Sequence, residues 1–397
     1  MSSPHTPNTS TNIKMRVLVS AGEASGDLYA ALVVEELRRL WPRAEFFGCT
    51  GPRLRAAGVE TVVDAASLAV VGLVEVVGHI PRIYGEYRRL LRAARERKPD
   101  VAILTDSPDF HLRVARQLRR IGIPVVYLVA PQVWAWRRGR LPQMRRDLAH
   151  LLCIFPFEER FFGEAGLAAT YIGHPLVGLV KPCLGRSEFF RKHGLDEGRP
   201  LIAVLPGSRR GEAARHLPAL IDAMWRLQKR REGPAPQFVL PASETAGAKF
   251  FQLRLGAAPV TVIEGESWDA MAHADVALAA SGTVTIEAAL LGTPMVTFYR
   301  VTWPSWVAGK LLVRVPFFSM VNLVAGRAVV PELMQSRMTG ANLAAEAARL
   351  LNDAEARREM RAGLEQARRR LEAPVSPARR AASIIQAILE GQAVHAS

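Results

Sequence analysis

Several apolar runs of this chain end in side chains that could do acid–base or phosphate chemistry. Asp106 ends the run ILTD, and a carboxylate at the carboxyl end of a strand can remove a proton from a substrate hydroxyl. Asp109, just before Phe110, is better explained as a helix N-cap. Helix capping is also the alternative for Asp106. We predict that Asp106 is a catalytic base.

A glycine-containing loop, AGEASGD, follows the apolar run at 15–20. Its two glycines would let the backbone approach a ligand, and a helix beginning near Asp27 would offer unpaired N–H groups to an anion. The loop matches neither G-x-G-x-x-G nor a Walker A motif, so it indicates dinucleotide or ATP binding only weakly. The alternative is a tight turn capped by Ser25 or Asp27. The substrate-binding residues predicted here are Gly22, Glu23, Ser25 and Gly26.

Two further loops could bind a diphosphate. In LPGSRRGE, at 205–212, the turn leaves Arg209 or Arg210 to clamp a phosphate, because a planar guanidinium suits bidentate oxyanion binding. In SGT, a helix N-terminus and two hydroxyls would bind an anion, and Glu287, one turn further on, could accept hydrogen bonds from ribose. The alternatives are a solvated arginine pair and an exposed glutamate. We predict Arg209 as catalytic, and as substrate-binding Ser208, Ser281, Gly282, Thr283 and Glu287.

Short apolar runs alternate with helical patterns along most of the chain, which predicts parallel sheets built from βαβ units. A stretch rich in glycine and proline, at 173–185, separates two such series. We therefore predict two doubly wound domains that bind ligands beyond the carboxyl ends of their strands. The predicted strands are 15–20, 45–49, 101–106, 125–129, 151–155, 170–172, 201–205, 237–240, 260–264, 276–280 and 294–299. Helices are predicted at 28–40 and 110–121, and after about Ala328 the pattern is entirely helical.

Length and composition narrow the class of protein. A chain of 397 residues exceeds the size at which one core stops growing, which again favours two domains. The three cysteines form no C-x-x-C pair and indicate neither a disulfide framework nor a zinc site. The longest uncharged stretches, 121–136 and 165–180, are too short to span a membrane, and the polar N-terminus is not a secretory signal. The net charge of +15 would suit nucleic acid, an anionic membrane surface or an anionic substrate.

Two segments have the composition of a lipid-facing surface. Residues 79–98 mix aliphatic and tyrosine side chains with seven basic and two acidic residues, and 303–318 interleaves two tryptophans, a lysine and an arginine with aliphatic residues. Basic residues beside aromatic and aliphatic ones are typical of an interfacial helix. The alternative for each segment is an ordinary surface helix with arginines on its solvated face.

Taken together, the motifs resemble the lipid-A-disaccharide synthase family, which are glycosyltransferases of Gram-negative bacteria. The resemblance covers 14–335 and depends on nine motifs in a fixed order. They are GEASGD (22–27), VVGLVEVVG (70–78), DSPDF (106–110), VWAWR (133–137), FPFE (155–158), IGHP (172–175), LPGSR (205–209), SGT with Glu287, and NLVAGR (322–327). The chain departs from the family pattern at Ala130, Gln132, Met320 and Val321. It also has His111 where the family pattern has Asn.

The resemblance implies an α/β fold called GT-B, in which two Rossmann-like doubly wound domains face each other across a cleft, with helices at the C-terminus. Residues 1–13 would be a flexible tail, 14–180 an acceptor and lipid domain, and 181–375 a UDP-sugar domain. The last helix, 376–397, would cap the sheet of the C-terminal domain, cross back to the first domain or dock on another subunit. Carried over by position, Asp106 resembles the family's essential aspartate, Arg209 its essential arginine, and Asn322 an asparagine of the nucleotide site.

The reaction implied by the resemblance transfers a sugar from UDP-2,3-diacylglucosamine to the 6-hydroxyl of 2,3-diacylglucosamine 1-phosphate. The products are a β-1,6-linked disaccharide 1-phosphate, a step of lipid A biosynthesis, and UDP. We expect a direct, inverting displacement in which Asp106, with His111 nearby and in the substrate site, deprotonates the acceptor. Arg209, the helix tip at 281–283 and Asn322 would stabilise the leaving diphosphate. No Asp-x-Asp pair occurs in the chain, so we expect no metal, and we expect no cofactor.

The expected partners are the two lipid-linked sugars and the anionic cytoplasmic face of the inner membrane, with the oligomeric state left open. Two other functions remain as alternatives. A GT-B-like UDP-sugar epimerase or hydrolase would share the nucleotide half but need no lipid-facing surface. A basic nucleic-acid-binding protein would suit the charge, but the chain carries no recognisable reader motif, so we expect no nucleic-acid partner.

Overall fold

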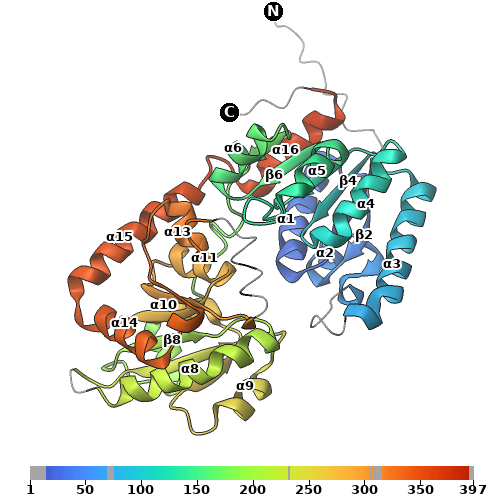
Figure 1. Ribbon diagram of the computed structural model, residues 1–397. Helices are drawn as coiled ribbons and strands as arrows, with labels where there is room; N and C mark the ends of the chain where they lie inside the picture. Colours follow the sequence, from blue (N-terminus) through green and yellow to red (C-terminus); the bar gives the residue numbers. More distant parts are fainter. Residues whose placement is uncertain are drawn as a thin grey trace, which may run out of the picture. The chain divides into compact units, whose positions relative to one another are not determined.

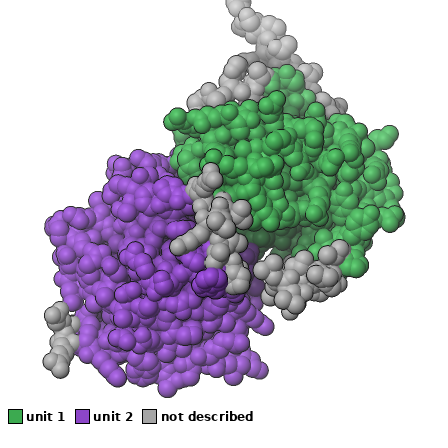
Figure 2. All heavy atoms as spheres, viewed as in Figure 1, with its two compact units in different colours: residues 1–175, 373–397 green, residues 176–372 purple. Residues whose placement is uncertain are grey.

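The computed structural model describes residues 15–68, 76–230, 233–303, 306, 309 and 315–392. The chain divides into two compact units, coloured separately in Figure 2. Unit 1 contains Met1–Pro175 and Ala373–Ser397, and unit 2 contains Leu176–Glu372. The predicted tail, residues 70–75 of the VVGLVEVVG motif and most of the segment at 303–318 lie outside the described residues.

Unit 1 is built on a seven-stranded, all-parallel sheet with the strand order β3-β2-β1-β4-β5-β6-β7. Its strands are β1 (Arg16–Ala21), β2 (Glu45–Thr50), β3 (Glu60–Asp64), β4 (Val101–Thr105), β5 (Val125–Leu128), β6 (His150–Cys153) and β7 (Ala169–Tyr171). Every residue of β4, β5 and β6 is buried, as expected for parallel strands covered on both faces. The strand order reverses between β1 and β4, and such a switch point is where doubly wound sheets bind ligands.

The last helix of the chain completes unit 1. The helices of this unit are α1 (Ala24–Leu40), α2 (Pro52–Ala56), α3 (Val76–Arg97), α4 (Pro108–Arg120), α5 (Leu141–Asp147), α6 (Pro156–Glu164) and α16 (Pro377–Leu389). Helix α16 packs against α1, and α3 packs beside α4 (Figure 1). The packed face of α16 buries small and aliphatic side chains, namely Ala381, Ala382, Ile384 and Ile385.

Unit 2 repeats the topology with six parallel strands in the order β10-β9-β8-β11-β12-β13. Its strands are β8 (Leu201–Leu205), β9 (Gln237–Ala242), β10 (Thr261–Glu264), β11 (Val276–Ala280), β12 (Met295–Tyr299) and β13 (Glu332–Met334). Its helices are α7 (Arg186–His193), α8 (Arg210–Gln228), α9 (Ala248–Leu255), α10 (Ser267–His273), α11 (Thr283–Leu290), α13 (Met320–Ala325), α14 (Gly340–Asn352) and α15 (Ala354–Leu371). The switch point of this sheet lies between β8 and β11.

These sheets confirm the predicted fold class of two Rossmann-like units. The expectation that the last part of the chain is entirely helical is wrong. The chain after Ala328 is not entirely helical, because β13 pairs with β12. At three residues β13 is too short to leave a periodic pattern; its position is set by the parallel register and by Thr297, whose hydroxyl donates to the Pro331 carbonyl at 2.8 Å. Strand β3 was not predicted either. In the described part of the chain, no helix has both the length and the apolarity that crossing a membrane requires.

Candidate active site

Asp106 lies at the switch point of unit 1, against the glycine-containing loop. Strands β1 and β4 are paired up to Ala21 and Thr105, so the two following loops begin side by side. The Gly22 N–H donates to Asp106 Oδ1 at 2.9 Å and the Glu23 N–H donates to Oδ2 at 3.0 Å. Both carboxylate oxygens are therefore anchored by the loop that follows β1.

The two glycines of this loop make room for the Asp106 segment. A Cβ atom at position 26 would lie 1.8 Å from Asp106 Oδ2, and one at position 22 would lie 2.4 Å from Ser107 Oγ. Neither approach is possible for a real side chain. The sequence interpretation, that Gly22 and Gly26 bring the backbone to a ligand, is corrected to this extent: the space beside each glycine is filled by Asp106 or Ser107.

The Asp106 carboxyl has the proton affinity of a general base that works near neutral pH. Its side chain is only 12% exposed, and burial raises its pKa to about 7, against the lowering effect of the N–H groups of Glu23 and Gly22. A base is most effective when its pKa lies near the working pH. A strongly shifted carboxyl at a sheet switch point is also typical of a functional site.

His111, from α4, supports Asp106 from inside the protein. Its ring has no exposed surface. Its Nδ1 lies 3.0 Å from the Asp106 backbone oxygen, and its Nε2 lies 2.7 Å from Ser20 Oγ. Burial lowers the pKa of His111 to about 4, so the ring is neutral at physiological pH. We therefore move His111 from the predicted substrate-binding residues to those that support Asp106.

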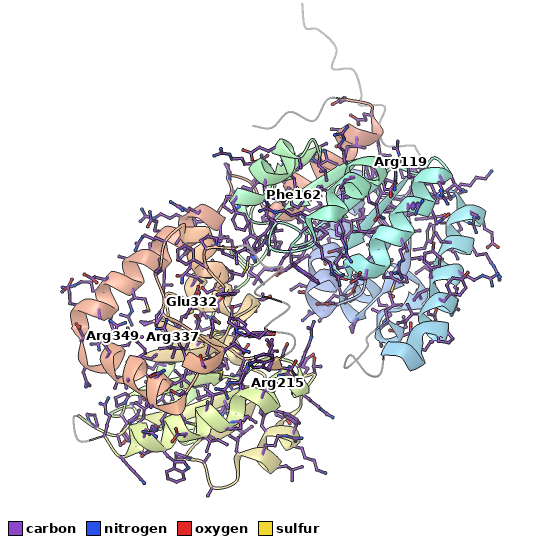
Figure 3. The ribbon with its side chains drawn as sticks, viewed as in Figure 1. Arg119, Phe162, Arg215, Glu332, Arg337 and Arg349 are labelled. Atoms are coloured by element: carbon purple, nitrogen blue, oxygen red, sulfur yellow. The ribbon has the colours of Figure 1, made fainter. Side chains whose placement is uncertain are left out.

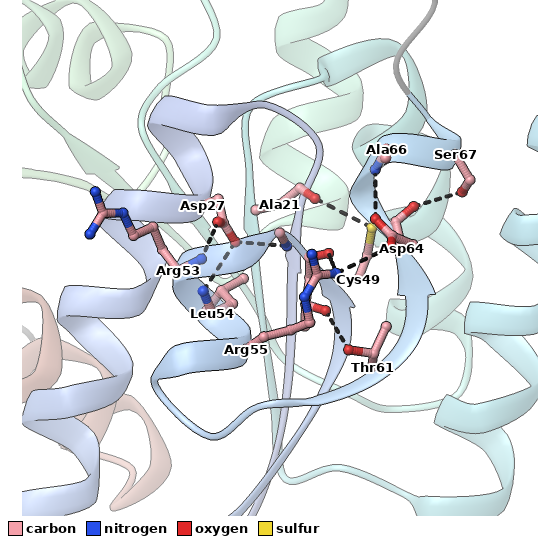
Figure 4. A network of polar contacts seen from close by, with 12 residues as sticks. Ala21, Asp27, Cys49, Arg53, Leu54, Arg55, Thr61, Asp64, Ala66 and Ser67 are labelled. Atoms are coloured by element: carbon pink, nitrogen blue, oxygen red, sulfur yellow. Dashed lines mark hydrogen bonds and ion pairs between the residues drawn. The ribbon is translucent and has the colours of Figure 1, made fainter. Parts of the chain in front are cut away.

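The alternative for this loop, a turn capped by Ser25 or Asp27, is wrong. Helix α1 begins at Ala24 with Glu23 as its N-cap, and Ser25 lies exposed within its first turn. Asp27 lies inside α1 and accepts hydrogen bonds from the N–H groups of Gly51, Arg53 and Leu54, so it binds the start of α2 (Figure 4). The same view shows the Cys49 thiol donating to the Ala21 carbonyl and Arg55 paired with Asp64. These contacts fix the ends of β1, β2 and β3 beside the Asp106 loop.

Asp109 is not the N-cap of α4, because that position is occupied by Ser107. Its carboxylate instead pairs with two arginines of the loop after β5: Arg137, whose Nη1 lies 3.1 Å from Oδ1, and Arg140. The Arg137 guanidinium also stacks over the Trp136 ring, 4.2 Å from the ring centre. Two arginines against one aspartate leave net positive charge on the first turn of α4, three residues after Asp106.

In unit 2, the loop after β8 carries Arg209 at the N-terminus of α8. Arg209 is the N-cap of that helix and, like Ser208, is exposed. Buried His216 fixes the loop, because its Nδ1 lies 2.8 Å from the Pro206 carbonyl oxygen while its Nε2 accepts from the Arg300 N–H at 3.0 Å. Arg210 donates to the Ala246 carbonyl. Arg209 directly precedes the first turn of α8, where a helix N-terminus favours an anion.

The loop after β11 lies on the other side of the second switch point. The Ser281 hydroxyl donates to the Phe318 carbonyl at 2.8 Å, and Thr283 is the exposed first residue of α11. Apart from Gly282 itself and its two chain neighbours, no described residue has an atom within 4 Å of a Cβ built on Gly282. A helix N-terminus at this position favours an anion.

Glu287 does not fit the alternative of an exposed glutamate, and Asn322 differs from the nucleotide-site asparagine that the resemblance implies. Glu287 is partly buried rather than exposed, and burial raises its pKa, while the Trp268 side chain hydrogen-bonds its carboxylate. The Asn322 amide is fully used inside the protein. It donates to the Val330 carbonyl and to Glu332 (labelled in Figure 3), and it accepts from the N–H groups of Val329 and Val330. Because Glu332 also accepts from the N–H groups of Phe318 and Ser319, Asn322 shapes the segment beside Ser281.

Sequence reasoning missed two buried polar residues near the carboxyl ends of the strands of the first sheet. Tyr127, in β5, donates its hydroxyl to the Asp106 carbonyl; a tyrosine inside an apolar strand was the available signal, because a buried hydroxyl needs a partner. Glu158 accepts from the Trp134 indole at 3.0 Å and from the N–H groups of Ile154 and Phe155, and burial raises its pKa to about 8. It thus links the VWAWR and FPFE motifs. Among the described residues, no three His, Cys, Asp or Glu side chains converge as ligands for a metal ion.

The sequence matches a protein family described as lipid-A-disaccharide synthetase over residues 17–388. A lipid-A-disaccharide synthase of Solibacter usitatus is 69% identical over 382 residues, which cover 96% of this chain and 100% of that protein. A second protein of that name, from Koribacter versatilis, is 46% identical over 362 residues, with 90% of this chain and 94% of that protein covered.

Solved structures with little sequence identity share the fold. A UDP-GlcNAc 2-epimerase from Neisseria meningitidis, bound to UDP-GlcNAc, superposes with a TM-score of 0.64 at 15% identity and covers 95% of this chain and 100% of that chain. The calicheamicin glycosyltransferase CalG4 gives 0.58 at 17% identity, with 95% and 98% covered. An epimerase and a glycosyltransferase therefore share this architecture.

Proposed function

This chain belongs to the lipid-A-disaccharide synthetase family, and on that premise we propose that it joins two diacylated glucosamines. The donor is UDP-2,3-diacylglucosamine, and the acceptor is 2,3-diacylglucosamine 1-phosphate. The products are the β-1,6-linked disaccharide 1-phosphate and UDP. The structural observation that carries the proposal is Asp106, a carboxyl with a pKa of about 7 held at the switch point of unit 1.

Unit 1 supplies the base in this proposal. Asp106 takes the proton from the acceptor 6-hydroxyl as that oxygen attacks C1 of the donor sugar. The bond between C1 and the diphosphate oxygen breaks on the opposite face, and its electron pair leaves with UDP, so the configuration at C1 inverts. A pKa near 7 leaves a large fraction of the carboxyl ionised at neutral pH and strengthens it as a base compared with an ordinary aspartate.

Unit 2 supplies the groups that bind the leaving UDP. The Arg209 guanidinium and the Ser208 hydroxyl, at the N-terminus of α8, are offered to the diphosphate. The N-terminus of α11, at 281–283, adds partial positive charge from its unpaired N–H groups. Glu287, one turn into α11, is assigned to the ribose hydroxyls. The reaction proposed here uses no metal and no cofactor.

The acceptor phosphate is assigned to Arg137 and Arg140. Both guanidinium groups pair with the carboxylate of Asp109, in the first turn of α4. Two positive charges beside one negative charge leave a net positive charge there. Arg137 remains 44% exposed, and a guanidinium is suited to bidentate contact with phosphate. The 1-phosphate of the acceptor provides the negative charge that this pair would bind.

Helix α3 is proposed to contact the anionic cytoplasmic face of the inner membrane. The exposed part of α3 combines Tyr84, which is 58% exposed, with exposed Arg82, Arg88 and Arg89. Basic residues near an anionic bilayer contribute about 1 kcal/mol each. Vesicles containing anionic lipid should therefore bind the protein more tightly than neutral vesicles, and added salt should weaken the binding. Equal binding to both kinds of vesicle would contradict this assignment.

The decisive experiment incubates the protein with UDP-diacylglucosamine in the presence and absence of diacylglucosamine 1-phosphate. The synthase predicts a disaccharide 1-phosphate and one UDP per disaccharide, only when both substrates are present. Release of UDP without acceptor would favour a hydrolase, and an epimerised sugar would favour an epimerase. The likeness to an epimerase concerns the fold alone and does not favour that activity.

A further inference from the structure

The backbone of Asp106 lies in a conformation that neighbouring groups have to hold. Its φ is 54°, and that of Ser107 is 38°. In this left-handed region an L side chain crowds the adjacent carbonyl, so the conformation persists only where the surrounding structure restrains it. The conformation also directs the side chain, because the carboxylate reaches the N–H groups of Gly22 and Glu23 from it.

The restraint acts on the backbone carbonyl oxygen of Asp106, which accepts two hydrogen bonds. His111 Nδ1 lies 3.0 Å from this oxygen, and the Tyr127 hydroxyl donates to it as well. Resting on the function proposed above, we propose that His111 and Tyr127 are positioning residues, which clamp the Asp106 carbonyl and thereby aim its carboxylate. Neither side chain has exposed surface, so neither contacts a substrate.

The hydrogen-bond partners of His111 fix which ring nitrogen carries the proton. A carbonyl oxygen can only accept, so Nδ1 is the protonated nitrogen of the neutral ring. Nε2 is then an acceptor and receives the hydrogen of the Ser20 hydroxyl, 2.7 Å away. Because burial keeps the pKa of His111 at about 4, protonation does not disturb this arrangement near neutral pH. Burial likewise raises the pKa of Tyr127, so its hydroxyl remains a donor.

His111 acts through the carbonyl and not on the carboxylate. Its Nδ1 lies 3.9 Å from Asp106 Oδ1, which is beyond hydrogen-bond distance. Withdrawing a carbonyl donor would let residue 106 relax towards an ordinary backbone conformation. That change turns the carboxylate away from Gly22 and Glu23 while leaving unit 2, which is proposed to bind UDP, unaltered.

A pair of amide substitutions at position 111 separates positioning from simple core packing. In His111→Asn, the amide nitrogen occupies the place of Nδ1 and can still donate to the Asp106 carbonyl. In His111→Gln, the amide lies further out, near the place of Nε2, and can reach Ser20 but not the carbonyl. We expect His111→Asn to keep kcat within a few-fold of the wild type and His111→Gln to lose about 10–100-fold, the scale expected for a misplaced reacting group.

Tyr127→Phe tests the second donor, because it removes only the hydroxyl. We expect a similar fall in kcat, of about 10–100-fold, with an unchanged dissociation constant for UDP in isothermal titration calorimetry. On the acid side of the kcat–pH profile, the pH of half-maximal kcat should also fall. A released Asp106 side chain is more exposed to water, and this lowers its pKa. A loss that appears in the KM for the donor, with kcat unchanged, would overturn the proposal.

His150 provides the matched control. It is a buried histidine of the same sheet, at the amino end of β6, and its Nε2 lies 2.9 Å from the Thr170 hydroxyl. His150→Gln should match His111→Gln in loss of thermal stability while retaining kcat. If both glutamine variants lose kcat equally, or if His111→Asn and His111→Gln behave alike, the carbonyl clamp is refuted.

The proposal can be tested even if the proposed reaction is wrong. Absence of disaccharide with the wild-type protein would refute the reaction alone. The clamp would still be tested by stability. The unfolding free energy is measured at several pH values for the wild type and for each variant at positions 111 and 127, both with Asp106 and with Asp106→Asn. The difference between the two members of each pair gives the contribution of Asp106 at that pH. In the His111→Gln and Tyr127→Phe backgrounds this pH dependence should shrink, and in the His111→Asn background it should persist. Equal pH dependence in all backgrounds would refute the clamp.

Discussion

The glycine turns at the two switch points differ in what occupies the space beside them. Next to Gly26, after β1, the Asp106 carboxylate would lie 1.8 Å from an added Cβ. Next to Gly282, after β11, no described residue other than Gly282 and its two chain neighbours has an atom within 4 Å of an added Cβ. The same topology thus gives one turn filled by the protein's own carboxylate and one turn whose backbone a ligand can approach.

The difference teaches how one architecture supplies two kinds of chemistry. In unit 1 the packing around Asp106 removes water from a carboxyl and raises its pKa to about 7. In unit 2 the loops after β8 and β11 present exposed Ser208, Arg209 and Thr283 at helix N-termini. A filled turn favours a base with a tuned pKa, and an open turn favours the binding of an anion.

The largest expected effect is the loss of the base. Asp106→Asn should reduce kcat by about 10²–10⁴-fold, the contribution typical of a general base. UDP binding, measured by calorimetry, should be unchanged, because the proposed UDP groups belong to unit 2. Asp64→Asn, which alters another carboxylate at the same end of the sheet, is the control and should retain kcat. Near wild-type turnover in Asp106→Asn would remove the contrast between the two turns.

Filling the packed turn should be nearly as severe. In Gly26→Ala the new Cβ would collide with Asp106 Oδ2, so the carboxylate must move. We expect kcat to fall by about 10²-fold, as for a displaced reacting group, with a lower melting temperature. Circular dichroism and steady-state kinetics measure the two effects. A variant with normal kcat and melting temperature would show that the turn has more room than the structure gives it.

Removing Arg209, in the loop after β8 on the other side of the same switch point, should have a smaller effect on both binding and rate. Arg209→Ala should weaken UDP binding and lower kcat/KM for the donor by about 10–100-fold, in line with 1.5–3 kcal/mol for a hydrogen bond to a charged group. Arg209→Lys should recover part of the loss, because it keeps the charge but not the planar donor pair. Exposed Arg226, whose partner is Asp222 in the same helix, provides an alanine control. Unchanged donor kinetics in Arg209→Ala would contradict the assignment of Arg209 to the diphosphate.

Filling the open turn is the counterpart of the Gly26 variant. Gly282→Ala adds a methyl group where the described residues leave space, and the φ of 168° is extended backbone that alanine adopts readily. Folding should therefore be preserved, while the KM for the donor rises a few-fold because the methyl group obstructs the diphosphate. If donor binding is unaffected, the ligand does not approach this backbone.

The last expected effect concerns folding and not turnover: it is the pH dependence of stability that Asp106 produces. Between about pH 4 and pH 7 the unfolded carboxyl has lost its proton and the folded one retains it, so raising the pH favours unfolding. Above pH 7 both states are ionised and the contribution is constant. The wild-type stability relative to Asp106→Asn should therefore fall across that window, by at most about 1.4 kcal/mol per pH unit. Over the same range kcat should rise with pH. Chemical denaturation at several pH values checks the sign, and a relative stability that rises with pH would contradict it.

The sequence predicted the sheets well because their central strands are apolar runs with punctuating loops. The positions of Asp106, Arg209 and Ser281 followed from the same pattern, since Asp106 and Ser281 come directly after strands and Arg209 lies in the loop after one. The role of His111 could not be predicted, because it depends on a left-handed backbone at Asp106 that has no signature in residue type. The amide of Asn322 was misjudged for a related reason: its partner Glu332 is the first residue of a short strand, β13, that only its pairing with β12 reveals, and its partner Val330 lies just before that strand.

The return of the chain to unit 1 has a consequence for how the protein is made. Residues Ala373–Ser397 complete the unit that carries Asp106, and α16 covers the apolar face of α1. During synthesis, unit 2 is complete in sequence as soon as residue 372 has left the ribosome, whereas α1 waits for the last helix. Unit 1, which carries Asp106, therefore reaches its native state last, and a premature stop codon before α16 would leave α1 exposed to the chaperones and proteases of the cell.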